Sequence, residues 1–260
     1  MRKRKISKAE RRHQDYVRRE GLKVGKVYEA RLIKARRTEV KRVLDIARDF
    51  DSPEDVASVI QRIDETKYIQ PWLEGLYKTA GMPCAERVAK QLRDKKAESF
   101  SESDAWYDTL VLYARKRAGE LIQSISDTLK KSIVAKLREL MEDDVGMPIE
   151  KLTRALYASY KRDIEKWQAR RIAQTETMIS MSRAGQAAAD TLDIAYTKTW
   201  AVSGLDNTRD THLAMDGITV DQHDYFELAG GKLLYPHDLS MNPDPSEIIN
   251  CACDVIRDPK

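Results

Sequence analysis

Two apolar stripes at helical spacing, separated by a short turn, restrict the fold of this chain more than any other feature. Each stripe recurs every three or four residues, which is typical of one buried face on a helix with about 3.6 residues per turn. Because only a turn around Gly146 and Pro148 separates them, the pattern predicts an antiparallel helical pair. The first stripe contains Ile122, Ile125, Leu129, Ile133, Leu137 and Leu140, and the second contains Leu152, Leu156, Tyr160, Ile164 and Trp167.

Helical signals extend over residues 27–192. Ser52 followed by Pro53 is typical of a helix start, since Ser caps the N-terminus and Pro is favoured in the first turn. Pro71 can open another helix, and residues 81–83 are expected to break or kink it.

After residue 192 the sequence takes on the pattern of a small α+β unit. β-branched and aromatic residues dominate positions 194–202, which predicts a strand, and Asp216-Gly217 is a hairpin-turn signal. We therefore expect an α+β protein that is mainly α, with an elongated helical body and a small C-terminal α+β module. The expected parts are a basic N-terminal arm at residues 1–26, the helical body at residues 27–192 and the module at residues 193–260.

Charge is distributed unevenly along the chain. Residues 1–42 contain 17 Lys and Arg against 5 Asp and Glu, whereas residues 201–260 contain 4 against 11. Such an N-terminal segment is either a solvated tail or an arm that lies on nucleic acid or on an acidic protein surface. As an arm it would contact DNA through Arg2, Lys3, Arg4, Lys5, Arg11, Arg12, Arg18 and Arg19.

The composition excludes several classes of protein. No stretch approaches the roughly 18 consecutive apolar residues of a membrane span, and no apolar segment follows the basic N-terminus as in a secretory signal. Three cysteines are too few for a disulfide framework. We expect a protein of a cytoplasm, or of a particle assembled there.

His212, Cys251 and Cys253 are candidate ligands of one metal ion, most plausibly zinc, because two thiolates and an imidazole are three of the four ligands that zinc prefers. His237, Asp210 or His223 could complete the set. The alternative is a reduced thiol pair with His212 hydrogen-bonded to a loop backbone. A disulfide between the two cysteines is disfavoured by the one-residue loop.

The charged residues around these candidates favour a structural role. Asp206, Arg209 and His212 step by three, so a helical turn would place them on one face. No P-loop, GxSxG or HExxH motif accompanies them, and we find no nucleophile. We expect no enzymatic activity, and we expect a network that stabilises the module and includes Asp206, Arg209, Asp216 and Glu176.

The region from about residue 115 to residue 256 resembles the phage Mu F-like family, also called the phage head morphogenesis or minor head protein family. The resemblance rests on elements in the family's order: Arg170-Arg-Ile-Ala-Gln-Thr-Glu176, Lys198-Thr-Trp200, Asp206-Asn-Thr-Arg209-Asp-Thr-His212-Leu-Ala-Met-Asp216-Gly217 and Glu247-Ile-Ile-Asn250-Cys251-Ala-Cys253. Two positions depart from it, since Ala252 and Gln174 stand where the family often has Arg.

The resemblance implies a minor structural protein of a tailed-phage head. Such a protein lies in the virion interior after assembly in the host cytoplasm, associates with the portal protein, and contacts packaged double-stranded DNA. Capsid or scaffolding proteins are further possible partners. Two alternatives remain: a metal-dependent hydrolase or toxin-like effector module delivered with the genome, and a helical adaptor that binds only protein.

Overall fold

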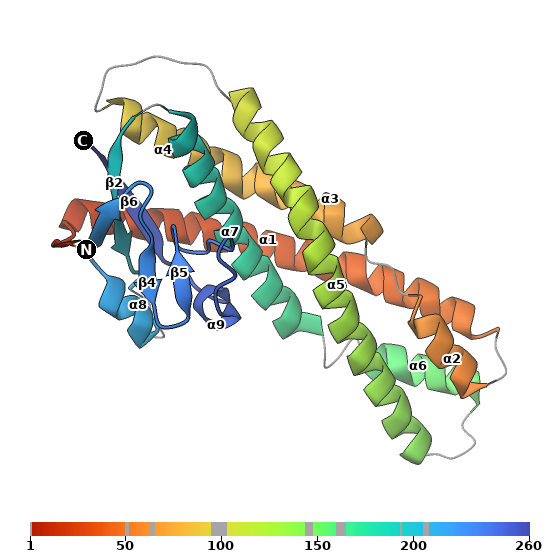
Figure 1. The fold of residues 1–260 in the computed structure, drawn as a ribbon. Helices are drawn as coiled ribbons and strands as arrows, with labels where there is room; N and C mark the ends of the chain where they lie inside the picture. Colours follow the sequence, from red (N-terminus) through yellow and green to blue (C-terminus); the bar gives the residue numbers. More distant parts are fainter. Residues whose placement is uncertain are drawn as a thin grey trace. The chain divides into compact units, whose positions relative to one another are not determined.

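The computed structural model describes residues 2–49, 52–62, 66–94, 103–143, 148–159, 165–192, 194–204 and 208–260. The expected class is confirmed, since the chain is mainly helical with a small C-terminal sheet module of antiparallel strands (Figure 1). Its helices are α1 (Lys8–Ala47), α2 (Pro53–Ile60), α3 (Thr66–Leu76), the π-helical turn η1 (Tyr77–Gly81), α4 (Met82–Asp94), α5 (Ser103–Asp143), α6 (Ile149–Ser159), α7 (Glu165–Thr191), α8 (Asp210–Met215) and α9 (Pro245–Ile248). Its strands are β1 (Arg2–Lys3), β2 (Tyr196–Ala201), β3 (Ile218–Asp221), β4 (Phe226–Leu228), β5 (Gly231–Leu233) and β6 (Asp254–Pro259).

The chain divides into two compact units. Unit 1 contains Met1–Val27, Gly75–Tyr113 and Ala173–Lys260, and unit 2 contains Tyr28–Glu74 and Ala114–Ile172. This division differs from the expected arm, body and module. The N-terminal residues and α4 belong with the C-terminal strands, and one boundary falls inside α1. Within the described part of the chain, no helix combines the length and apolarity of a membrane span.

The core of unit 2 contains parts of both apolar stripes. Ile133 and Leu137 of α5 and Leu152 and Leu156 of α6 are buried in one cluster with apolar residues of α1 and α2. Trp167, by contrast, is 58% exposed, so its expected core position is wrong. Trp167 lies in α7, whereas Leu152 and Leu156 of the same stripe lie in α6. The side chains of Ile122, Ile125 and Leu129, and the residues Tyr160 and Ile164, lie outside the described part.

The structure confirms the expected start of α2 and contradicts the helix start expected at Pro71. Ser52 caps α2 as expected, with its side chain accepting a hydrogen bond from the Asp55 backbone N–H and Pro53 in the first turn. Pro71 lies inside α3, which begins at Thr66, so the expected helix start there is wrong. No break occurs at residues 81–83, because α3 continues through the π-helical turn into α4.

The sheet of unit 1 joins both ends of the chain. Its strand order is β1-β3-β2-β6 with every pairing antiparallel, and β4 and β5 form a separate hairpin. The two termini therefore lie at the same sheet (Figure 1). The expected strand at 194–202 is β2, whereas Asp216-Gly217 links a helix to a strand and is not the turn of a hairpin. Gly217 has φ +78°, and a Cβ on it would lie 2.3 Å from the Arg4 carbonyl oxygen, so only glycine fits there.

Candidate functional site

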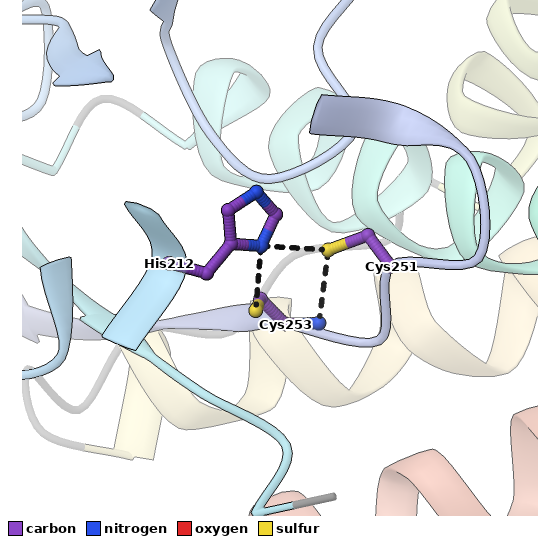
Figure 2. A group of neighbouring side chains, drawn as sticks. All are labelled: His212, Cys251 and Cys253. Carbon is purple, nitrogen blue, oxygen red and sulfur yellow. Dashed lines mark hydrogen bonds between the residues drawn. The ribbon is translucent and has the colours of Figure 1, made fainter. Parts of the chain in front are cut away.

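Three predicted metal ligands meet inside unit 1. His212 lies in α8, and Cys251 and Cys253 lie in the segment between α9 and β6. The His212 Nδ1 atom is 3.5 Å from the Cys251 sulfur and 3.4 Å from the Cys253 sulfur (Figure 2). All three side chains are buried, with residue exposures of 1%, 5% and 2% in that order. Among the described residues, these three form a group that could hold a metal ion.

The spacing of these atoms matches a tetrahedral site. With Zn–S bonds of about 2.3 Å and Zn–N bonds of about 2.05 Å, tetrahedral angles place nitrogen and sulfur about 3.6 Å apart. The observed Nδ1–sulfur distances of 3.5 and 3.4 Å are within about 0.2 Å of that value. The three donors therefore lie where a small thiophilic cation can contact all of them without a large rearrangement.

The other side of the His212 ring contacts a carboxylate. His212 Nε2 lies 2.8 Å from the Glu247 Oε2 atom, and Glu247 is itself 4% exposed. Trp200 packs against the imidazole edge-to-face at 5.5 Å between ring centroids, and Phe226 packs against Trp200 in the same manner at 5.1 Å. The ring is therefore held by a hydrogen bond at one nitrogen and by aromatic packing on its side.

Hydrogen bonds between side chains and the backbone hold the segment that carries the two cysteines. The Asn250 N–H donates to Thr175 Oγ1 of α7 at 3.2 Å, and Arg209 donates to the Ile249 carbonyl oxygen. Asn250 adopts a left-handed conformation with φ +56°, which Asn tolerates better than most residues. The backbone that precedes the two cysteines is thus held by contacts that do not require a metal.

His237, predicted as a fourth ligand, instead links the backbone of this segment to α7. Its Nε2 atom lies 3.1 Å from the Cys251 carbonyl oxygen and its Nδ1 atom lies 2.9 Å from Ser182 Oγ of α7. Burial lowers the pKa of His237, which favours the neutral ring. Both ring nitrogens are therefore engaged, and the structure does not bring His237 into the group of three donors.

The two thiols differ in acidity. Burial opposes ionisation of Cys251, but hydrogen bonds from the Cys253 side chain and backbone N–H lower its pKa. The same side-chain hydrogen bond, together with burial, raises the pKa of Cys253 well above its usual value. Both thiols would have to give up their protons to a bound cation, because metal ligation requires thiolates.

The remaining predicted residues occupy other positions in unit 1. Asp210 and His223 are exposed, and Asp206 lies outside the described residues. Asp216 accepts hydrogen bonds from the Val202 N–H at 3.0 Å and from the Arg11 guanidinium. Glu176 is buried in α7 at 1% exposure.

The basic N-terminal residues separate into two groups. Arg4 and Arg11 belong to the fold of unit 1, where Arg4 pairs with Glu10 and Asp258, and Arg11 pairs with Asp216. Arg18 is half-buried beside Asp15. The others with described side chains, namely Lys3, Lys5, Arg12 and Arg19, are exposed, and the Arg2 side chain lies outside the described part.

Exposed cations form a continuous stripe on the first half of α1. We call this stripe the cationic ridge and define it as Lys8, Arg12, Arg19, Lys23 and Lys26, all exposed. With the exposed Tyr16, successive members step by four, four, three, four and three residues, so they share one helix face. At 1.5 Å per residue the ridge is about 27 Å long. The three- and four-residue spacing of these cations is visible in the sequence. It indicates a common face only if the segment is helical, and the predicted N-terminal arm was not expected to be a helix.

The clearest omission among the site residues is Glu247. Its position four residues before Cys251 was visible in the sequence, but a Glu three residues after Asp244 at a helix start is usually interpreted as a capping residue. Thr175 and Ser182 were also missed, since nothing near them in the sequence indicates the distant segment that they contact.

In comparisons with known proteins, no family model, no curated protein and no solved structure matches this chain.

Proposed function

We propose that this chain is a minor structural protein of a tailed-phage head that associates with the portal and contacts packaged double-stranded DNA. The observation that carries the proposal is the cationic ridge of α1, a straight row of exposed cations on one helix face. The resemblance of residues 115–256 to minor head proteins supplies the setting, and association with the portal rests on that resemblance alone.

The ridge suits a polyanion that is contacted without sequence readout. Successive cations of the ridge are separated along the helix axis by about 6, 10.5, 6 and 4.5 Å, and their long, flexible side chains can reach successive phosphates of a DNA strand. Each neutralised phosphate releases counterions, so binding should weaken steeply with salt. Arg4 and Arg11 are removed from the predicted DNA contacts because acidic side chains of unit 1 hold them partly buried, whereas Lys23, which pairs with Glu20 at 2.6 Å, stays exposed.

We further assign zinc to the group of His212, Cys251 and Cys253, as a structural ion of the C-terminal module. Zinc accepts this donor set at the observed spacing. A catalytic zinc needs a coordination position that substrate can reach, and these three side chains are between 1% and 5% exposed. The burial therefore favours a structural ion over the metal-dependent hydrolase.

Charge reversal on the ridge tests the DNA contact. A variant carrying Arg12→Glu, Arg19→Glu, Lys23→Glu and Lys26→Glu should lose retention of double-stranded DNA of arbitrary sequence, with its circular dichroism spectrum unchanged. Five phosphate contacts correspond to a slope of about −4.5 in log K against log salt for the wild type, and the variant should approach zero slope.

A matched control carries the same change in charge elsewhere. Lys90 of α4 and Lys116, Lys131 and Arg138 of α5 are exposed and lie on other helices than the ridge, so their fourfold change to Glu should retain a substantial salt-dependent affinity. If this control loses binding as fully as the ridge variant, only net charge matters and the ridge is not the contact. Co-purification of both variants with the portal protein separates the DNA role from the portal role.

A further inference from the structure

Glu247 is surrounded by hydrogen-bond donors. Its Oε2 atom lies 2.8 Å from His212 Nε2 and accepts a hydrogen bond from Thr211 Oγ1 at 3.2 Å, and its Oε1 atom accepts one from the Gly230 backbone N–H at 3.1 Å. At 4% exposure it has little contact with water. None of these three contacts is with a Lys or Arg side chain. The buried carboxylate is therefore directed at the histidine.

The short helix α9 places this carboxylate. Asp244 caps the helix, with its side chain accepting from the Ser246 N–H at 2.7 Å. In a reciprocal capping arrangement Glu247 would bind back to the Asp244 N–H, but that N–H donates instead to the Gly230 carbonyl oxygen at 2.8 Å. Glu247 is therefore released from capping and turns inward.

Gly230 leaves the space that Glu247 occupies. A Cβ at this position would lie 2.5 Å from Glu247 Cγ and 2.7 Å from Oε1, closer than real Cβ contacts. Gly230 contributes both the room for the side chain and the N–H that fixes Oε1.

The contact decides which nitrogen of His212 carries the proton. A carboxylate can only accept, so the proton of the neutral imidazole resides on Nε2 and the lone pair resides on Nδ1. Nδ1 is the atom that faces both sulfurs, at 3.5 and 3.4 Å (Figure 2). A ligating histidine commonly donates its other N–H to a carboxylate, which fixes the ring and raises its basicity.

We propose that Glu247 is the positioning residue of this centre, holding His212 so that Nδ1 coordinates a divalent, thiophilic cation together with Cys251 and Cys253. The inference rests on the proposed metal site and adds the residue that prepares it. Glu247 does not touch the ion. Its effect is on the affinity for the ion and on the geometry around it.

The test uses the full chain, with Zn²⁺ affinity measured by competition against a chromophoric chelator and geometry measured from the visible spectrum of the Co²⁺ form. Wild type should bind one Co²⁺ with thiolate-to-cobalt charge-transfer bands. Glu247→Ala should weaken Zn²⁺ binding by about 10–100-fold and change the ligand-field bands. Glu247→Gln retains one acceptor oxygen and should fall between the two. Glu227→Gln, at an exposed site on β4, is the control and should match wild type.

The outcomes separate the two proposals. If wild type and Cys251→Ser both show no charge-transfer bands, the metal site itself fails and the role of Glu247 fails with it. If wild type binds Co²⁺ through thiolates and Glu247→Ala leaves affinity and spectrum unchanged, only the positioning role is wrong. Should Glu247→Ala not fold without metal, the affinity and spectrum of Glu247→Gln decide by the same criteria.

Discussion

The Arg4 guanidinium donates to the Asp258 carboxylate at 2.9 Å and thereby joins the start of the chain to its last strand. The same guanidinium contacts Glu10 at 2.9 and 3.2 Å and Thr199 Oγ1 at 3.1 Å, while the Arg4 backbone N–H donates to the Gly217 carbonyl oxygen at 2.7 Å. A residue interpreted from the sequence as a DNA contact is therefore part of the framework of unit 1.

Replacement of Arg4 should destabilise unit 1 without affecting the ridge. Because the ion pairs are partly exposed and screened, we expect Arg4→Ala to lower the free energy of unfolding by about 1–2 kcal/mol, as measured by urea denaturation. Lys5→Ala, at the exposed neighbouring position, should change it by less than about 0.5 kcal/mol. Equal stability of the two variants would remove Arg4 from the framework.

Glu10 should make unit 1 sensitive to acid. The hydrogen bond from Arg4, helped by those from Ser7, lowers the pKa of Glu10 to about 2. Since the folded pKa lies below the unfolded value of about 4.3, the stabilisation is present above that value and is lost as the pH falls towards 2. Glu10→Gln should lower stability at pH 7 and should show a shallower decline in urea midpoint between pH 4.5 and pH 2.5 than wild type.

Lys198 should make unit 1 more stable as the pH rises in the alkaline range. Burial, followed by the nearby Arg257 charge, lowers the pKa of Lys198 to about 8, although its Nζ donates to the Gln222 carbonyl oxygen at 2.8 Å. Between pH 8 and the unfolded pKa of about 10.4 the unfolded chain binds more protons, so stability should rise with pH. Urea midpoints measured from pH 7.5 to 9.5 should increase for wild type and remain flatter for Lys198→Met. A wild-type midpoint that falls over this range would contradict the assignment.

The sequence contained enough information for some of these features and too little for others. The helical class, the strand at 194–202 and the group of His212, Cys251 and Cys253 follow from local signals, namely spacing, β-branched content and ligand chemistry. β1 does not, because two residues show no alternation and its pairing partner is more than 200 residues away. Glu247 was hidden for a related reason: its local pattern is that of a capping residue, and only the distant Gly230 releases it from that role.

Removal of the proposed zinc ion should weaken unit 1. A ligand that binds only the folded state at a free concentration 100 times its dissociation constant stabilises by about 2.7 kcal/mol. We therefore expect a strong chelator to lower the thermal midpoint of wild type and to leave that of Cys251→Ser unchanged. Elemental analysis of both proteins as purified provides the metal content. A wild-type midpoint insensitive to chelator, in protein that contains zinc, would show that the ion does not support the fold.

Gly230→Ala should damage the proposed metal centre through a steric clash. The new methyl group would lie 2.5 Å from Glu247 Cγ, so either the carboxylate or the β4–β5 turn must shift, and His212 loses its support. We expect Zn²⁺ affinity to fall by about 10-fold or more, together with a loss of about 1–3 kcal/mol in unfolding free energy. Gly204→Ala is the comparison, because Gly204 has φ +67° and open space around it, so it tests backbone strain without a clash. This variant should lose about 1 kcal/mol and bind Zn²⁺ as wild type does, so that equal loss of affinity in both variants would trace the effect to general destabilisation and not to Glu247.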